Sequence, residues 1–328
     1  MKAAVYTRYG PPDVVQFADV DKPVPKDNEV LIKVRAASVN PLDWHYMRGT
    51  PRFLRLMAGL RKPNVTRLGV DVAGRVEAVG RNVTQLRPGD EVFGSCRGAF
   101  AEYACTSESA LVTKPDNVTF EQAAAVPVAA YTALQGFRDK GRIRPGQKVL
   151  INGAAGGVGT LAVQIAKSFG ADVTGVCSTR NVGMVRSLGA DQVIDYTQQD
   201  FTKSGERYGL IFDLVGNHSL SACRRVLNPK GIYIGAGGGQ GGSMIGLLAH
   251  WVAELVLSRF MGQKFVTLLA KRSKADLTVM RELMEAGKVT PVIDKCYPLS
   301  EVPEAIRYLE EGHARGKVII TLEQGSAT

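Results

Sequence analysis

The most informative stretch of the chain reads Lys148-Val149-Leu150-Ile151-Asn152-Gly153-Ala154-Ala155-Gly156-Gly157-Val158-Gly159. Its first five residues form an apolar run typical of a buried strand, and residues 158–169 follow with helical spacing of apolar side chains. A glycine-rich turn between a strand and a helix places backbone N–H groups where a pyrophosphate binds. We therefore expect a dinucleotide site at Gly153, Ala155, Gly156, Gly157 and Val158. The alternative is a glycine-rich turn in an unrelated α/β protein.

Alternating strand and helix signals continue on the C-terminal side of this turn. Strand-like runs lie at 172–177, 192–195, 210–215 and 231–235, and a helical segment lies at 181–188. Repeated β-α-β units imply a parallel sheet with helices on both faces. We assign residues 126–262 to a Rossmann domain with a doubly wound parallel sheet.

The first 120 residues have a different pattern. Residues 29–35 alternate as a half-buried strand does, and Arg87-Pro88-Gly89-Asp90 is a turn before another strand. Spaced strands of this kind predict a β barrel or sandwich. We expect residues 263–328, with helices and a final strand at 317–322, to pack on this part. The predicted catalytic domain is therefore 1–125, completed by 263–328.

Composition limits the class of protein. The 328 residues carry a net charge of +10, and residues 126–262 hold 14 basic against 8 acidic side chains. No nucleic-acid recognition motif accompanies the charge, so an anionic dinucleotide explains it better than DNA or RNA. Five cysteines without a C-x-x-C pair favour a reducing compartment, and no signal peptide is evident, so we expect a cytoplasmic protein. Residues 244–260 are apolar but too interrupted by charge for a membrane span.

The residues after the second strand of this domain indicate which dinucleotide binds. An NAD site usually has an acidic residue there to bond the ribose 2′-hydroxyl. This chain has Ser178-Thr179-Arg180-Asn181 instead. A hydroxyl and a guanidinium suit a 2′-phosphate, which a carboxylate would repel. Ser178 and Arg180 therefore predict NADPH, unless both are ordinary loop residues.

Several further stretches carry a family resemblance over nearly the whole chain. They are Ala37-Ser38-Val39-Asn40-Pro41-Leu42-Asp43, Gly69-Val70-Asp71-Val72-Ala73-Gly74, Gly98-Ala99-Phe100-Ala101-Glu102-Tyr103, Leu188-Gly189-Ala190-Asp191 with Ile194-Asp195-Tyr196, and Gly312-His313-Ala314-Arg315-Gly316-Lys317. With the Gly153 turn, they resemble the zinc-independent medium-chain dehydrogenases/reductases, in the quinone oxidoreductase (zeta-crystallin) branch. The resemblance implies a GroES-like, β-rich catalytic domain, formed from both chain ends, around a Rossmann domain.

Zinc is not expected. Alcohol dehydrogenases of the superfamily hold a catalytic zinc with Cys, His or Glu, and Cys, and the matching positions here are Asn40, Val70 with Asp71, and Val128. Asn and Val are poor zinc ligands, and Asp71 alone cannot hold the metal. The four-cysteine structural zinc loop is also missing, and the four histidines show no ligand spacing.

The resemblance implies catalytic roles near the first domain's loop. Asn40 would lie near the nicotinamide, where its amide could bond the carboxamide or the substrate oxygen. Asp43 would organise the Asn40 loop, or simply be a turn residue. His45 and Tyr46 would donate a proton or shape the pocket, although relatives carry Tyr or Lys at the position of His45.

The resemblance also implies cofactor contacts. Thr132 would touch the nicotinamide, Tyr196 would lie against the adenosine end, and Val215 would meet the nicotinamide ribose. His313 and Arg315 would reach the cofactor from the catalytic domain. The alternatives are a helix residue bonding its own turn for Thr132, a core aromatic for Tyr196, and a surface turn for His313 and Arg315.

Chemistry without a metal suits substrates that are already electrophilic, because nothing polarises a simple alkoxide. We therefore expect NADPH-dependent hydride transfer to a small-molecule quinone or α,β-unsaturated carbonyl, in a homodimer as in relatives. A zinc-free alcohol or aldehyde oxidoreductase and a non-catalytic NADPH-binding protein remain alternatives.

Two segments have no assigned role. Residues 52–67 carry five basic side chains and no acid, together with Phe53 and several aliphatic residues. They could form a lid over the substrate, a surface for acidic lipid headgroups, or a solvated loop with apolar anchors. Residues 244–260 could line the substrate cleft, form a dimer interface or belong to the core.

Overall fold

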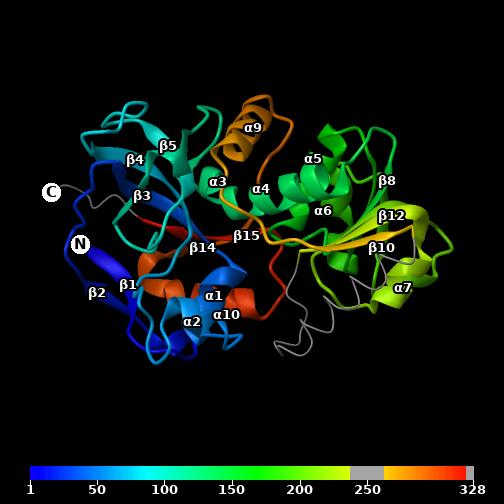
Figure 1. Cartoon of the computed structure of the whole chain (residues 1–328), viewed down its shortest axis with the longest axis horizontal. Helices are drawn as coiled ribbons and strands as arrows, with labels where there is room; N and C mark the ends of the chain where they lie inside the picture. Colours follow the sequence, from blue (N-terminus) through cyan, green and yellow to red (C-terminus); the bar gives the residue numbers. More distant parts are fainter. Residues whose placement is uncertain (237–261, 323–328) are drawn as a thin grey trace. The chain divides into compact units, whose positions relative to one another are not determined.

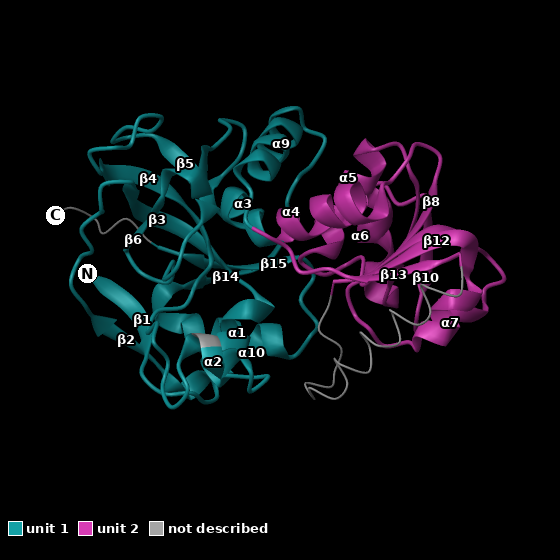
Figure 2. Cartoon of the chain, in the orientation of Figure 1, with its two compact units in different colours: residues 1–128, 272–328 teal, residues 129–271 magenta. Residues whose placement is uncertain are grey.

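The structure, a computed structural model, describes residues 1–236 and 262–322. Its chain divides into two compact units, coloured separately in Figure 2. Unit 1 is Met1–Val128 with Arg272–Thr328, and unit 2 is Ala129–Lys271. Residues 244–260, to which the sequence analysis gave three possible roles, lie outside the described residues.

Unit 2 is built on one parallel sheet of six strands (Figure 1). The strands are β8 (Lys148–Asn152), β9 (Asp172–Cys177), β10 (Gln192–Asp195), β11 (Tyr208–Asp213), β12 (Leu227–Gly235) and β13 (Lys264–Thr267). They lie in the order β10-β9-β8-β11-β12-β13, and every pairing is parallel. This is the doubly wound order in which two mononucleotide-binding halves meet between the first and fourth strands. The predicted Rossmann sheet is confirmed.

The helices of unit 2 follow from its sequence pattern. They are α5 (Gly159–Ser168), α6 (Val182–Ser187) and α7 (Leu220–Arg225), and α4 (Pro127–Leu134) enters the unit from unit 1. In α5, Leu161 and Ile165 are four residues apart and both are buried, as the helical spacing requires. The structure differs from expectation at residues 264–267, because β13 pairs with β12 and so extends the parallel sheet rather than the catalytic domain.

Unit 1 is β-rich. Its strands are β1 (Lys2–Tyr6), β2 (Val15–Asp19), β3 (Glu29–Val39), β4 (Asp71–Val79), β5 (Glu91–Ser95), β6 (Tyr103–Ser107), β7 (Leu111–Thr113), β14 (Ile293–Pro298) and β15 (Lys317–Thr321). Seven of them form one sheet in the order β14-β15-β3-β4-β5-β7, with β6 also paired to β3, while β1 and β2 form a separate antiparallel pair. The expected packing of the C-terminal strand on the N-terminal part is confirmed by the antiparallel pairing of β15 with β3.

The helices of unit 1 are α1 (Pro41–Arg48), α2 (Leu54–Ala58), α3 (Phe120–Ala124), α9 (Lys274–Glu285) and α10 (Val302–Glu310). A bidentate ion pair joins α1 to α10, with Arg48 Nε 2.5 Å and Nη2 2.8 Å from the Glu310 carboxylate oxygens. Arg307 of α10 also pairs with Asp13. These contacts fix the C-terminal helix on the N-terminal segment.

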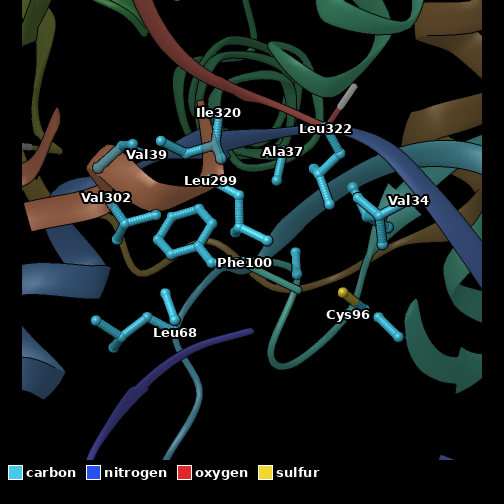
Figure 3. Packing of buried hydrophobic residues seen from close by; sticks show 14 of the residues in the cluster. Val34, Ala37, Val39, Leu68, Cys96, Phe100, Leu299, Val302, Ile320 and Leu322 are labelled. Atoms are coloured by element: carbon cyan, nitrogen blue, oxygen red, sulfur yellow. The ribbon is translucent and has the colours of Figure 1, made fainter. Parts of the chain in front are cut away.

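The core of unit 1 draws on both ends of the chain. Figure 3 shows Phe100 among Val39, Leu299 and Val302, all of which are buried. Within the described ranges, no helix is long and apolar enough to cross a membrane.

Candidate active site

A buried polar cluster lies in unit 1 where three strands of its sheet meet α1. It consists of Ser38 near the end of β3, Asn40 and Asp43 at the start of α1, Asp71 at the start of β4, and Lys317 at the start of β15. Strand pairing brings them together, because Ser38 is opposite Asp71 and Val39 is opposite Val318. All five side chains are buried, so each polar atom needs a partner within the protein.

Lys317 and Asp71 form the charged centre of this cluster. Lys317 Nζ lies 2.7 Å from Asn40 Oδ1 and 3.7 Å from Asp71 Oδ2. Asp71 Oδ2 also accepts hydrogen bonds from Ser38 Oγ at 2.8 Å and from Asn40 Nδ2 at 2.9 Å. Burial raises the pKa of Asp71 and lowers that of Lys317, while each charge opposes that change in the other. The Asn40 amide is therefore held at both ends.

Asp43 organises the backbone around Asn40. Its Oδ2 accepts the Asn40 N–H at 2.8 Å, and its Oδ1 accepts the Gly69 N–H at 2.9 Å. Burial is the main reason that the pKa of Asp43 rises to about 7, although both hydrogen bonds lower it. This geometry agrees with a positioning role for Asp43.

His45 and Tyr46 lie two and three residues further along α1, and both are half-buried. His45 Nδ1 is 2.8 Å from the Thr50 carbonyl oxygen, which can only accept, so Nδ1 carries the proton. Burial lowers the pKa of His45, and a neutral imidazole bonded in this way has no second N–H to donate. The ring also stacks on Trp44.

The positions that hold zinc in zinc-dependent relatives carry a different arrangement here. The Val128 backbone N–H donates to Asp71 Oδ1 at 3.1 Å, and its aliphatic side chain carries no ligand atom. The ammonium of Lys317 donates to Asn40 Oδ1. Among the described residues, no group of three His, Cys, Asp or Glu side chains could hold a metal ion. A divalent cation does not fit this donor set, because a buried ammonium would repel it.

The glycine-rich turn of unit 2 connects β8 to α5, as the sequence predicts. Gly153 has φ of +87°, and a Cβ at Gly159 would lie 2.1 Å from the Gly153 carbonyl oxygen. Gly156 is open by comparison, since a Cβ there would meet only the Gly153 oxygen at 3.5 Å. The Thr160 N–H donates back to the Gly156 carbonyl oxygen at 2.9 Å, which closes the turn at the start of α5. A glycine-rich turn at a helix N-terminus suits a pyrophosphate.

Asp213 supports this edge of the sheet, and the sequence analysis did not single it out. The side chain is buried at the end of β11. Its Oδ1 accepts from Asn152 Nδ2 and from the N–H groups of Val215 and Gly216, and its Oδ2 accepts from Tyr233 Oη. A buried carboxylate at the end of a parallel strand was the available signal, because parallel strands end at one edge.

The segment after β9 has polar groups suited to a ribose. Arg180 is exposed, and Ser178 Oγ accepts from Asn181 Nδ2 at 3.1 Å. Asn181 Oδ1 is buried without a partner in the described part of the chain, and an amide can be turned so that either end faces a ligand. Asp195 lies nearby, but its carboxylate is held by the hydroxyl groups of Thr179 and Thr197. These residues fit a phosphorylated adenosine.

The remaining residues expected to contact the cofactor lie on α4, after β10 and β11, and before β15. Thr132 is buried on α4, and Val215 follows β11. Tyr196 follows β10 and is 56% exposed, so its interpretation as a core aromatic is wrong. His313 and Arg315 are exposed in the turn before β15, where the Arg315 N–H donates to Asp294 Oδ2. Whether these residues contact a cofactor stays a prediction.

Comparisons with known proteins agree with this architecture. Residues 26–116 match the family model described as alcohol dehydrogenase GroES-like domain, and residues 188–320 match the one described as zinc-binding dehydrogenase. The 2-methylene-furan-3-one reductase of Solanum lycopersicum is 34% identical over 98% of this chain and 79% of its own length. The chloroplastic NADPH-dependent alkenal/one oxidoreductase of Arabidopsis thaliana is 35% identical, again over 98% of this chain and 79% of its own.

The solved structures give the same result. The quinone oxidoreductase from Coxiella burnetii has a TM-score of 0.86 and 32% identity, and the match covers 98% of this chain and 99% of that one. Fold and matches together define a two-domain α/β oxidoreductase with a GroES-like domain and a Rossmann domain. The chain belongs to the medium-chain dehydrogenase/reductase family, and the resemblance seen in the sequence is confirmed.

Proposed function

We propose that this protein is an NADPH-dependent oxidoreductase that transfers a hydride to a quinone or an α,β-unsaturated carbonyl compound. Relatives whose names specify an NADPH-dependent alkenal/one oxidoreductase and a quinone oxidoreductase support this reaction. When bound, NADPH supplies the hydride. The protein's own residues then have to hold the dinucleotide, order the loop at Asn40 and exclude water.

The choice of NADPH depends on one observation above all. Arg180 is exposed directly after β9, the strand whose end carries the ribose-binding carboxylate in NAD-specific sites. Ser178 and Asn181 flank it with polar groups. The turn from Gly153 to Gly159 would hold the pyrophosphate, with Asp213 keeping the neighbouring strand ends in place.

We further propose that the enzyme works without zinc. Lys317, Asp71 and Asn40 already satisfy one another, and none of the three is left as a metal ligand. Electrophilic substrates need no Lewis acid for hydride addition, whereas simple alcohols do. A zinc-free alcohol or aldehyde oxidoreductase and a non-catalytic NADPH-binding protein are the competing proposals.

A cytoplasmic location and a homodimer complete the proposal. All five cysteines are free, which fits a reducing compartment. Sedimentation velocity of the purified chain would test the dimer, and a monomer at working concentrations would contradict it.

The reaction is tested by following NADPH oxidation with a quinone, an enone, a saturated ketone and an aldehyde in turn. We expect turnover with the quinone or the enone and little with the saturated ketone. Preference for the aldehyde would favour the alcohol/aldehyde alternative. Tight NADPH binding without any turnover would favour the binding protein.

Cofactor choice is tested by Arg180→Glu. We expect this variant to lose its preference for NADPH, because a carboxylate repels the 2′-phosphate and can bond a ribose hydroxyl. The change in kcat/KM ratio should be on the order of a hundredfold or more, given the strength of charge-assisted hydrogen bonds. Lys230→Glu changes an exposed residue of the same unit by the same charge and serves as the control. An unchanged ratio of kcat/KM with NADPH to kcat/KM with NADH in Arg180→Glu would contradict the role proposed for Arg180.

A further inference from the structure

Residues 52–65, which include the short helix α2, form an exposed surface that the proposed reaction does not use. We call this segment the 52–65 loop. Four of its apolar side chains are exposed: Leu56 is 76% and Leu60 68% exposed, and Phe53 and Val65 are also exposed. Scattered surface leucines need no explanation, but four large apolar side chains within one short segment do.

The same loop is purely cationic. No Asp or Glu occurs between Asp43 and Asp71. Of its basic residues, Arg55 is used internally, donating to the Gly49 carbonyl at 3.0 Å and lying over the Tyr9 ring. Arg52, Arg61 and Lys62 are exposed, and no carboxylate among the described residues forms an ion pair with them. Exposed leucines and unbalanced cations therefore share one surface.

The backbone of the loop is fixed, so this exposure is built into the fold. Tyr9 Oη donates to the Gly59 carbonyl at 2.6 Å, and the Asn64 N–H donates to the Ala58 carbonyl at 2.7 Å. Gly59 has φ of +115°, and a Cβ there would lie 2.0 Å from the Lys62 carbonyl oxygen. These contacts close a tight turn that holds Leu60, Arg61 and Lys62 at its tip.

We propose that the 52–65 loop docks the protein onto the surface of an anionic lipid bilayer. Leu56 and Leu60 would enter the acyl boundary, as apolar side chains of interfacial segments do, while Arg52, Arg61 and Lys62 meet the headgroups. Charge complementarity favours lipid, since the loop has no acidic group and the whole chain carries +10.

Docking of this kind goes beyond the proposed reaction and does not depend on it. Combined with that reaction, it would bring the enzyme to the layer in which quinones and enones with long apolar tails dissolve. Binding to vesicles is measured without any turnover, so failure of this proposal and failure of the proposed function are distinguishable.

The full-length protein is co-sedimented with vesicles of phosphatidylcholine alone and of phosphatidylcholine mixed with phosphatidylserine. We expect binding only to the mixed vesicles and weaker binding at high salt. The variant R52Q/R61Q/K62Q should lose on the order of a hundredfold in affinity, because each basic residue near an anionic surface contributes about fivefold. The variant L56S/L60S should lose about tenfold or more, because two exposed leucines no longer enter the apolar layer.

Matched controls separate the loop from overall charge and overall hydrophobicity. R87Q/K140Q/K230Q removes three exposed charges elsewhere, and V24S/L269S removes two exposed apolar side chains elsewhere. Both should bind nearly as well as the unchanged protein. Thermal unfolding of every variant checks that the fold is kept.

Three results would overturn the proposal. The first is the absence of binding to mixed vesicles. The second is equal loss of binding in loop and control variants, which would assign the effect to net charge. The third is conversion of a dimeric protein to a monomer by L56S/L60S. In that case a second copy of the chain, and not a lipid surface, would cover the 52–65 loop.

Discussion

Individual residues explain how the buried polar cluster of unit 1 is held together. The buried ammonium of Lys317 supplies a positive charge beside Asp71 and Asn40, and Asp43 accepts the backbone N–H groups of Asn40 and Gly69. Burial of two carboxylates and one ammonium is costly unless they are paired. The pairing of Lys317 with Asp71 is therefore sensitive to the loss of either of its two charges.

Lys317→Met should be strongly destabilising, because it leaves the Asp71 carboxylate buried and uncompensated. We expect a loss of about 3–5 kcal/mol in the free energy of unfolding, measured by urea denaturation. The double variant Lys317→Met/Asp71→Asn should lose less free energy of unfolding than the sum of the two single variants, because neither buried charge of the pair is then left without its partner. Lys2→Met is the control, since the Lys2–Asp19 pair is exposed and its loss should change stability by about 1 kcal/mol or less. Additive effects at Lys317 and Asp71 would contradict a direct pairing.

Asp43 makes stability depend on pH. Its pKa in the folded protein is raised to about 7 from an ordinary 3.8, so the folded state binds the proton more tightly than the unfolded state. Stability should then be highest at low pH for this group and fall as pH rises from about 4 to 7, by at most about 4 kcal/mol. Urea unfolding at a series of pH values measures this slope.

Asp43→Asn is the comparison for that slope, because an amide does not titrate. At low pH the variant should be less stable than the unchanged protein, because its NH2 group faces backbone N–H donors. As pH rises, its free energy of unfolding should fall less steeply than that of the unchanged protein. Identical slopes for the two proteins would show that Asp43 is not the titrating group.

At the scale of elements, each unit has one junction that positions its own buried polar groups. The β8–α5 turn brings the helix N-terminus to the carboxyl edge of the parallel sheet, and Asp213 joins the neighbouring ends of β8, β11 and β12 through hydrogen bonds. In unit 1, β15 lies beside β3 and delivers Lys317 to the end of that strand. Both junctions depend on close approach of backbones.

Gly159→Ala tests the first junction. The added methyl group would lie 2.1 Å from the Gly153 carbonyl oxygen, so the turn has to shift. We expect about 1–3 kcal/mol of lost stability and at least about tenfold weaker NADPH binding, measured by denaturation and by fluorescence titration. Gly183→Ala, on α6, is the matched control, because a Cβ there meets nothing within 4 Å. This variant should raise the free energy of unfolding by about 0.5–1 kcal/mol. Unchanged NADPH affinity in Gly159→Ala would argue against a cofactor at this turn.

At the scale of the whole molecule, the two units differ in continuity. Unit 2 is one uninterrupted segment, whereas unit 1 needs both ends of the chain, with β15 between β14 and β3. The core around Phe100 likewise contains Leu299 and Val302 from the C-terminal segment. A fragment that lacks that segment would expose this core.

We expect residues 129–271 expressed alone to fold and residues 1–128 expressed alone not to fold. Adding residues 272–328 as a separate chain should restore structure to residues 1–128, because this segment supplies β15 and α10, which complete the sheet and core of unit 1. Far-UV circular dichroism with urea titration measures each case. Cooperative unfolding of residues 1–128 alone would contradict the requirement for β15.

Sequence by itself determined the features that are local along the chain. The Gly153 turn lies within one strand–turn–helix unit, and the boundaries of β9 and β10 follow from short apolar runs. The family resemblance was equally accessible, because its motifs are short and contiguous. Each of these depends on neighbouring residues and on backbone periodicity, which a sequence displays directly.

Only the tertiary structure decided how Lys317 is used. The hydrogen bond from Lys317 to Asn40 joins residues 277 positions apart, and no local pattern gives the register in which β15 meets β3. Asp213 was missed for a similar reason, since two of its partners, Asn152 and Tyr233, lie on other strands. Burial makes these pairings obligatory, because a charge removed from water has to find its partner wherever the fold places one.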